Sequence, residues 1–486
     1  MSVFRNLFKQ TLIYGLATVL PRALGIVLVP LYVSVLGREQ YGIYATLMAF
    51  LILGNVLLSY GMETAFFRFI NKHSEQKAEV QSTALTSLTV TTFIFLGITL
   101  LFNDSIAEFL DFRSEFITYG LLILALDALC VLPFVWFRAN EQPMKYAVIK
   151  IFNVLVNLGL NLFFFLWLPK LAASAPGSFW DTINLTENKV AYVFIANLIA
   201  SAVTLLILLP RYVRIGFKFN RLIWKGMMRY AMPVLIAGIA FSINEAFDKI
   251  LLKYLLPEDI AETEVGVYAA CYKLGVFMTL FATAFRLGIE PFFFNHAANA
   301  SAPQTYAKIT KYFTIFGSCI LLFVIVYIDI FKLILIPDPK FWDALVVVPF
   351  ILLANLCLGI YHNFSVWYKV TDKTRYGAYI SVAGAVITLV LNFLLIPLIS
   401  YKGSAIATLA AYGSMMVLSY FLGQRNYAIP YDIRKIGGYL MLAVVFSALS
   451  FYVFEGNLII GTALLLVFLF WVFFAEKDEL KRIAKS

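Results

Sequence analysis

Long apolar runs constrain this chain more than any other feature of its sequence. Fourteen such runs follow one another, separated by short polar segments. An α-helix rises about 1.5 Å per residue, so roughly 20 apolar residues cross the hydrocarbon core of a bilayer. Hydrophobic residues make up 62% of the 486 positions and charged residues only 14%, which excludes a water-soluble fold. The sequence therefore predicts an all-α polytopic membrane protein with fourteen transmembrane helices.

The charges of the loops alternate in sign along the chain. When both termini are placed in the cytoplasm, Lys and Arg predominate in the inner loops, and acids predominate in outer loops such as residues 104–115 and 258–264. Cytoplasmic loops of membrane proteins carry this excess of basic residues. We therefore expect both termini to be cytoplasmic and attribute the net charge of +10 to topology. No soluble stretch is long enough to form a basic domain that binds nucleic acid.

An internal repeat relates the two halves of the chain. The segment from Trp136 aligns without gaps with the segment from Trp367, 231 positions later, and YGIYA from Tyr41 matches VGVYA from Val265, 224 positions later. Each match pairs a helix with the helix six crossings later, so the repeats have the same orientation. We expect two parallel six-helix lobes, related by an axis along the membrane normal with a cavity between them, plus a C-terminal two-helix hairpin. The predicted domains are an N-terminal lobe at 1–210, a linker at 211–229, a C-terminal lobe at 230–424, and the last two helices with the tail at 425–486.

The linker carries six basic residues and no acidic residue. From Arg214 to Arg229 the spacing of the bases is helical, and apolar residues occupy the remaining positions. We expect an interfacial helix on the inner leaflet, held by anionic headgroups. An ordinary basic loop on the cytoplasmic side is the alternative.

Eight charged residues fall inside the predicted spans, where an ionisable side chain is costly unless it pairs or faces a water-filled cavity. They are Arg22, Asp127, Glu245, Asp248, Lys249, Lys273, Arg286 and Glu290. Arg22 stands beside Pro21 at the middle of the first run, so it falls near the midplane. This depth favours a role in a cavity. An ion pair that only holds the bundle together is the alternative.

The basic members of this set favour an anionic, diphosphate-bearing substrate, because a guanidinium offers phosphate a planar, bidentate fork. The four bases are Arg22, Lys249, Lys273 and Arg286. The four acids, which we expect to balance charge or couple ions, are Asp127, Glu245, Asp248 and Glu290. For two neighbouring pairs, Asp248 with Lys249 and Arg286 with Glu290, a purely structural ion pair is the alternative.

The sequence contains no motif of a catalytic or metal site. It has neither the glycine-rich loop of an ATPase nor an H-E-x-x-H zinc motif, and its three histidines are spread over separate segments. The four cysteines lie inside apolar runs without paired spacing. We therefore predict no enzymatic activity, no cofactor, no metal and no disulfide framework.

Three segments carry a family resemblance. They are PRALGIVLVPLYVSVLGREQYGIYATLM near the N-terminus, MPVLIAGIAFSINEAFDKILLKYLL leading to VGVYAACYKLG, and KGSAIATLAAY from Lys402. The chain resembles the polysaccharide flippases of the MOP superfamily, the Wzx type, which have MurJ-type lipid II flippases and MATE exporters as relatives. The resemblance implies that a polyprenyl-diphosphate-linked oligosaccharide crosses from the cytoplasmic to the outer leaflet of a bacterial inner membrane by alternating access.

Coupling and partners follow from the same resemblance. A proton, a sodium ion or the membrane potential alone would drive transport, and the partners would be the lipid-linked oligosaccharide, membrane lipids and glycan-assembly proteins. A MATE-like cation or multidrug antiporter and a lipid II flippase are the alternatives within transport. A scaffold for a glycan-assembly complex is the alternative from another class.

Overall fold

The computed structural model describes residues 19–21, 23–72, 74–296 and 299–483. The regular structure within these ranges is all helical and contains no β-strand, as the sequence predicts. Thirteen of the described helices are long and apolar enough to cross a membrane. They match the second to the fourteenth predicted runs, whereas positions 12–18 and 22 of the first run lie outside the described residues.

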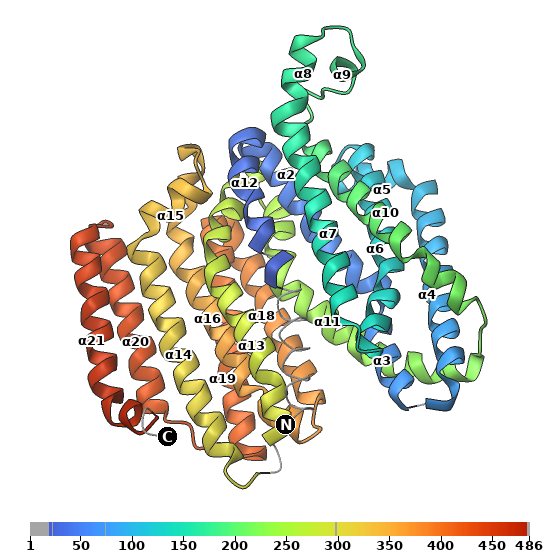
Figure 1. Cartoon of the computed structure of the whole chain (residues 1–486). Coiled ribbons are helices and arrows are strands. Elements are labelled where there is room, and N and C mark those ends of the chain that lie inside the picture. The colour runs from blue at the N-terminus through green and yellow to red at the C-terminus, as the bar shows by residue number, and fades with distance from the viewer. Residues whose placement is uncertain (1–18, 22, 73, 297–298, 484–486) are drawn as a thin grey trace. The chain divides into compact units, whose positions relative to one another are not determined.

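Contacts divide the chain into two compact units, Met1–Gly266 and Val267–Ser486 (Figure 1). The helices of the first unit are α2 (Leu28–Ser59), α3 (Met62–Lys72), α4 (Lys77–Leu101), α5 (Asn103–Leu110), α6 (Ser114–Ala139), α7 (Pro143–Leu162), α8 (Leu168–Ser174), α9 (Phe179–Thr182), α10 (Val190–Ile215), α11 (Arg221–Leu255) and most of α12 (Glu258–Tyr272). Those of the second unit are α13 (Val276–His296), α14 (Ala302–Val326), α15 (Ile328–Leu335), α16 (Val348–Phe364), α17 (Val366–Val370), α18 (Arg375–Ile399), α19 (Tyr401–Asn426), α20 (Ile433–Ala448) and α21 (Leu458–Ile483). The lobe boundary expected from the repeat, between residues 229 and 230, stays a prediction.

Helix α6 is the centre of the first unit, packing against α2, α4 and α10. Its sequence is apolar on all sides, which is typical of a helix surrounded by others. Its neighbour α7 runs on through a π turn over Phe163–Trp167 into α8. The joined helix Pro143–Ser174 has 32 residues, a length of about 48 Å, which exceeds the roughly 30 Å hydrocarbon core. With α9 it forms a hairpin that projects beyond the other helices of this unit (Figure 1).

The basic linker is not one continuous helix, which corrects the sequence prediction of a helix with the spacing of the bases from Arg214 to Arg229. Helix α10 ends at Ile215, and Gly216 follows with a left-handed φ of 72°. The side chain of Asn220 then caps α11 by accepting hydrogen bonds from the backbone N–H groups of Leu222 and Ile223. The prediction considered the spacing of the basic residues and took no account of Gly216. Glycine is the residue that most readily ends a helix, because it adopts a left-handed conformation without strain.

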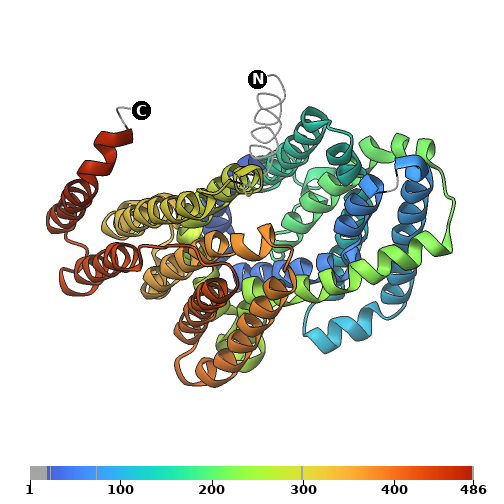
Figure 2. The same cartoon turned by 90° about the horizontal axis from the view of Figure 1, so that it is seen from below.

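Helix α16 has the corresponding central position in the second unit, where it packs against α13, α14 and α19. Consecutive helices α18 and α19 form a close antiparallel pair. The last two helices, α20 and α21, lie side by side at the edge of this unit and pack on α14, as both views show (Figures 1 and 2).

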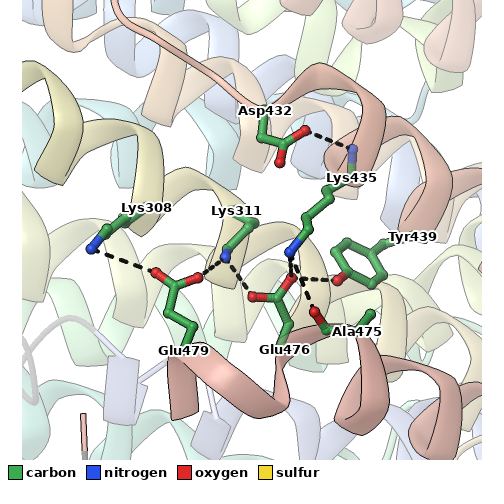
Figure 3. A network of polar contacts seen from close by, with 8 residues as sticks. All are labelled: Lys308, Lys311, Asp432, Lys435, Tyr439, Ala475, Glu476 and Glu479. Carbon is green, nitrogen blue, oxygen red and sulfur yellow. Dashed lines mark hydrogen bonds and ion pairs between the residues drawn. The ribbon is translucent and has the colours of Figure 1, made fainter. Parts of the chain in front are cut away.

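A network of charges holds α21 against α14 and α20 (Figure 3). Glu476 of α21 is only 2% exposed, and its partners are Lys311 of α14 together with Lys435 and Tyr439 of α20. Lys311 also pairs with Glu479, one turn further along α21. Removing one partner from a buried ion pair costs about 3–5 kcal/mol, because the other charge is left without compensation. The network therefore specifies where the C-terminal hairpin docks.

Two turns reproduce the repeat at the level of the backbone. Glu141 and Asp372, 231 positions apart, both adopt a left-handed φ, of 52° and 56°. In the helices that follow these turns, Asn161 and Asn392 occupy the next matched polar position. Both are fully buried, and each donates a hydrogen bond to the carbonyl four residues earlier. The two segments thus share conformation as well as sequence.

Two glycines from the second repeat match lie at one helix crossing. A Cβ atom on Gly42 of α2 would stand 1.8 Å from the carbonyl oxygen of Glu262, and one on Gly266 of α12 would stand 1.9 Å from that of Arg38. Gly42 and Gly266 are 224 positions apart, and so are Arg38 and Glu262. Only glycine permits this approach of two backbones. The crossing is therefore symmetric and joins equivalent positions of the two repeats.

Candidate functional site

Each of the two matched turns carries an ion pair to a preceding helix. In the first unit, Nη1 of Arg138 lies 2.9 Å from Oε1 of Glu63, and the side chains are 45% and 49% exposed. In the second unit, Nζ of Lys369 lies 2.6 Å from Oε1 of Glu290, and the side chains are 26% and 36% exposed. Arg138 and Lys369 are aligned residues of the repeat. These aligned bases thus each form an ion pair with a glutamate, once near the surface and once in a more enclosed place.

The ion pair of the second unit lines a pocket with further polar groups. Arg286, one turn before Glu290 on α13, lines it together with His362 of α16. Nη1 of Arg286 lies 3.3 Å from Nε2 of His362, to which the guanidinium can only donate. The pocket therefore holds two cations and one carboxylate. Its free volume is about 10 Å³, room for about one water molecule.

Arg286 and Glu290 are therefore both tied to other helices. The i, i+4 spacing suggests an ion pair within α13, but Glu290 bonds Lys369 of α17 and Arg286 bonds His362 of α16. Spacing along one helix reveals only neighbours on that helix. The structure adds two functional candidates, His362 and Lys369, that the sequence analysis missed. The match of Lys369 to Arg138 in the repeat was the signal that could have found it.

Asp127 of α6 lies in a polar cluster in the first unit. Its Oδ1 accepts a hydrogen bond of 2.7 Å from the hydroxyl of Ser201 on α10, and Asn55 of α2 is a second hydrogen-bond partner. Lys150 of α7 interacts electrostatically with the carboxylate, and its Nζ stands 4.3 Å from the ring centroid of Phe134. Three neighbouring helices thus bring polar groups to one carboxylate. Lys150 was not among the predicted residues because it stands near the start of its apolar run.

Helix α11 places its three predicted charges in different environments. Asp248 is 4% exposed, and its Oδ1 accepts a 2.9 Å hydrogen bond from Nζ of Lys249, so these two form the ion pair that was the structural alternative. Glu245 is exposed and, among the described residues, has neither an ion pair nor a hydrogen bond. An ionisable side chain inside an apolar span is costly unless it pairs or contacts water, which keeps Glu245 a functional candidate.

The two remaining predicted bases are separate from these sites. Lys273 begins a 3₁₀ turn, Lys273–Gly275, which interrupts the helix between α12 and α13. It does not line the pocket around Arg286. Arg22 lies outside the described residues. Of the predicted residues that the structure describes, Arg286 and Glu290 thus share one pocket, where each has a partner on another helix, and Asp248 pairs with Lys249.

Lys253 stands near the end of an apolar run, yet it is buried. Its side chain is 4% exposed, and Nζ lies 3.1 Å from Oδ2 of Asp111 and 3.0 Å from Oε1 of Glu262. It also stands 4.2 Å from the ring centroid of Phe112. One lysine of α11 therefore joins the segment after α5 to the start of α12, beside the crossing at Gly42.

Comparison with known proteins gives one family and one fold. The family model "Polysaccharide biosynthesis protein" matches residues 7–285, and no curated protein matches the chain. The fold is similar to that of lipid II flippase MurJ in an inward closed conformation, with a TM-score of 0.74 and 12% identity over 96% of this chain and 100% of that chain.

Two further solved structures are similar over most of their length. An inward-facing multidrug resistance MATE family transporter of the MOP superfamily gives a TM-score of 0.62 and 12% identity over 88% of this chain and 95% of that one. A MOP superfamily transporter from Pyrococcus furiosus also gives a TM-score of 0.62 and 12% identity, over 86% of this chain and 95% of that one. At these identities the likeness establishes the fold, which is that of the MOP transporters. The family model covers more than half of the residues of this chain, so the chain belongs to the family of polysaccharide biosynthesis proteins.

Proposed function

We propose that this multi-pass membrane protein is a flippase that moves a polyprenyl-diphosphate-linked oligosaccharide from the cytoplasmic to the outer leaflet of a bacterial plasma membrane by alternating access. The observation that carries the proposal is the pocket where Arg286 and Lys369 lie beside a single carboxylate, Glu290. Membership of the polysaccharide biosynthesis family supports the substrate class. The MOP fold supports the transport mechanism.

The pocket binds the substrate by exchanging partners. With a free volume of about 10 Å³ it has no room for a diphosphate in the described conformation. A diphosphate offers several anionic oxygens, so it would replace Glu290 at Lys369 and His362 at Arg286. Charge-assisted hydrogen bonds of this kind are about twice as strong as neutral ones. The internal partners keep the bases from facing hydrocarbon without compensation while the site is empty.

Lys273 and Arg22 are further candidates for the diphosphate, and Lys249 is a weaker one because Asp248 already holds it. A bare anion moved into hydrocarbon would cost tens of kcal/mol in the idealised limit. The bases replace the lost hydration. An inside-negative potential then favours outward movement by about 2.3 kcal/mol per charge per 100 mV, so two negative charges need no ATPase.

Ion coupling, if transport uses it, would involve Glu245 or Asp127. Glu245 is exposed on α11, and Asp127 accepts hydrogen bonds from groups that would also accommodate a proton or a cation. Asp248 is a weaker candidate because Lys249 neutralises it. Replacing Glu245 with Gln should abolish any dependence of transport on a proton or sodium gradient. If that dependence persists in the variant, Glu245 is not the coupling residue.

Farnesyl diphosphate is a suitable probe of the pocket, with farnesol as its uncharged control. The purified protein should bind the diphosphate and not the alcohol. Arg286→Ala and Lys369→Ala should each weaken binding, whereas Arg138→Ala serves as a matched control from the other turn. Equal binding of the diphosphate by all four proteins would contradict the assignment of the pocket.

Glycan display on cells tests the function itself. Cells that carry Arg286→Ala at normal membrane abundance should lose surface polysaccharide and keep their resistance to cationic drugs. Loss of drug resistance with normal glycan display would support the antiporter instead. Loss of cell-wall synthesis with normal glycan display would support a lipid II flippase. The lipid that copurifies with the wild-type protein separates the two diphosphate substrates by mass.

A further inference from the structure

The segment that joins α10 to α11 presents a basic surface that the transport proposal does not use. Five exposed bases follow one another there: Arg214, Lys218, Arg221, Lys225 and Arg229. The segment from 211 to 229 contains no acidic residue. Among the described residues, none of the five side chains has an ion pair or a hydrogen bond. Their charge is therefore not compensated within the described part of the chain.

Other bases at this end of the first unit are used within the protein. Arg138 forms its ion pair with Glu63. The guanidinium of Arg211, just before the five bases, lies 4.3 Å from the ring centroid of Trp136. The five bases thus differ from their neighbours, and they are available to a partner outside the chain.

Large apolar side chains alternate with these bases and are also exposed. They are Val213, Phe217, Phe219 and Leu222, with exposed fractions of 81%, 58%, 51% and 83%. Clustered apolar exposure of this kind marks a site of interaction with a protein or a membrane. The border between headgroups and acyl chains accommodates basic and apolar side chains together. We call these nine residues the linker surface.

Hydrogen bonds to α4 hold the loop in place. The backbone N–H of Asn220 donates to Oγ1 of Thr83 at 3.0 Å, and the carbonyl of Lys218 accepts from Oγ1 of Thr86 at 3.3 Å. Nδ2 of Asn220 also donates to Oε1 of Glu79 at 2.8 Å. Because the backbone is fixed in this way, binding to the exposed side chains costs less conformational entropy.

The corresponding segment six crossings later, between α19 and α20, is built differently. Ile429 in that segment is only 2% exposed, and Tyr427 and Tyr431 pack with it in the core of the second unit. Lys435, at the start of α20, pairs with Glu476. That segment turns its apolar residues inward and binds a base internally. The exposure of the linker surface is therefore a property of this segment and not of every connection in the fold.

The length of α11 places the linker surface at the border of the membrane. Its 35 residues extend over about 52 Å, whereas the hydrocarbon core is roughly 30 Å thick. Arg221 and Lys225 belong to its first two turns, which therefore stand outside that core. Lipid headgroups are thus the nearest partner for these bases.

We propose that the linker surface docks on the inner leaflet and binds the headgroups of anionic phospholipids such as phosphatidylglycerol. The bases contact the lipid phosphates, and the apolar side chains insert beside the acyl chains. Charge spacing alone suggested such headgroups, and the uncompensated bases, the exposed apolar side chains and the anchored loop now define where they bind. The ligand stays in its own leaflet, so this site is separate from that of the transported substrate.

Native mass spectrometry of the full-length protein tests the proposal. The protein is titrated with phosphatidylglycerol or phosphatidylcholine that have identical acyl chains, and the affinity for the first bound lipid is measured in each case. The wild type should prefer phosphatidylglycerol. Lys218→Gln should lower this preference about fivefold, since a base near the membrane surface contributes about 1 kcal/mol. No preference in the wild type, or an unchanged preference in the variant, would overturn the proposal.

Lys170→Gln is the matched control. Lys170 is an exposed base of α8, outside the linker surface. Both substitutions remove one exposed positive charge, so both variants should fold. The preference for phosphatidylglycerol should be unchanged in Lys170→Gln. An equal loss in the two variants would show that the preference follows net charge, which would overturn the assignment to the linker surface.

Leu222→Ser tests the apolar part of the linker surface. It should weaken the binding of both lipids at least about tenfold, since burial of a leucine side chain contributes about 1.5–3 kcal/mol. Unchanged binding of both would overturn the insertion of the apolar side chains.

Farnesyl diphosphate separates the linker surface from the transport pocket. Lys218→Gln should bind it as the wild type does, whatever the result for Arg286→Ala. Loss of farnesyl diphosphate binding in Lys218→Gln would overturn the choice of ligand. The preference for phosphatidylglycerol is measured without transport, so it stands or fails independently of the proposed function.

Discussion

The two matched turns differ in what surrounds their ion pairs. Arg138 with Glu63 stands near the surface, whereas Lys369 with Glu290 lines a pocket beside Arg286 and His362. The position aligned with His362, 231 residues earlier, is Val131. Arg286 precedes Glu290 by one turn of the continuous helix α13, whereas Glu63 lies at the start of α3, just after the left-handed residues Tyr60 and Gly61. One scaffold therefore carries extra polar groups in only one of its copies. Under the proposed function, the second unit contacts the substrate through this pocket, and the first unit has the ion pair without the pocket.

The largest expected effect comes from Arg286. Arg286→Ala should weaken the binding of farnesyl diphosphate about tenfold to a hundredfold, because each hydrogen bond to a charged group contributes about 1.5–3 kcal/mol. Arg138→Ala should change it less than about twofold, since an exposed ion pair contributes about 0–1 kcal/mol. Titration of both purified variants measures the difference. If the two variants lose the same affinity, the asymmetry between the turns has no functional meaning.

The buried asparagines should respond alike, because here the two copies agree. Asn161→Ala and Asn392→Ala each leave a hydroxyl without its acceptor, that of Tyr32 in one case and of Ser404 in the other. Each should lower the free energy of unfolding by about 1–3 kcal/mol. Thermal unfolding in detergent measures both. A loss in only one of them would show that the repeats are not equivalent in their cores.

Glu290→Gln should have a moderate effect on diphosphate binding, opposite in sign to that of Arg286→Ala. The variant frees Lys369 from its internal partner and should raise the affinity for farnesyl diphosphate about threefold, a change of about 0.7 kcal/mol that is typical of a half-exposed ion pair. Glu63→Gln is the matched control and should leave the affinity unchanged. Weaker binding by Glu290→Gln would mean that the carboxylate positions the bases rather than competing for them.

The smallest effect is expected at the left-handed residues of the turns. Glu141→Gly and Asp372→Gly should each change the free energy of unfolding by less than about 1 kcal/mol, because glycine relieves the strain of a positive φ but loses more entropy on folding. The two values should agree within error. A large loss at one turn alone would reveal a side-chain role there that its partner lacks.

Much of the fold could be predicted because it rests on properties that a linear sequence records. Apolar length predicted the spans, and the matched segments from Trp136 and Trp367 predicted the shared turn. Gly216 interrupts the linker where charge spacing alone suggested a helix. The left-handed conformation of this one glycine ends the helix, although the basic residues on both sides of it have helical spacing.

The candidate site could be predicted only in part. Arg286 and Glu290 were found because charges inside apolar runs are conspicuous. Lys369 and Lys253 were not among the predicted residues, because they stand near the ends of apolar runs, yet both reach partners in other helices, and Lys253 does so with a side chain only 4% exposed. A long, flexible side chain at the end of a span can turn inward, and the choice of direction depends on tertiary neighbours that the sequence does not name.

The crossing at Gly42 also has a consequence for biosynthesis. Its partner carbonyl belongs to Glu262, which leaves the ribosome 220 residues after Gly42. At about 5–20 residues per second, that interval takes about 10–45 s. During this time the glycine surface of α2 has no permanent partner. The first unit therefore completes its packing only after the first residues of the second repeat have been synthesised. Folding of the first repeat thus depends on translation of the second.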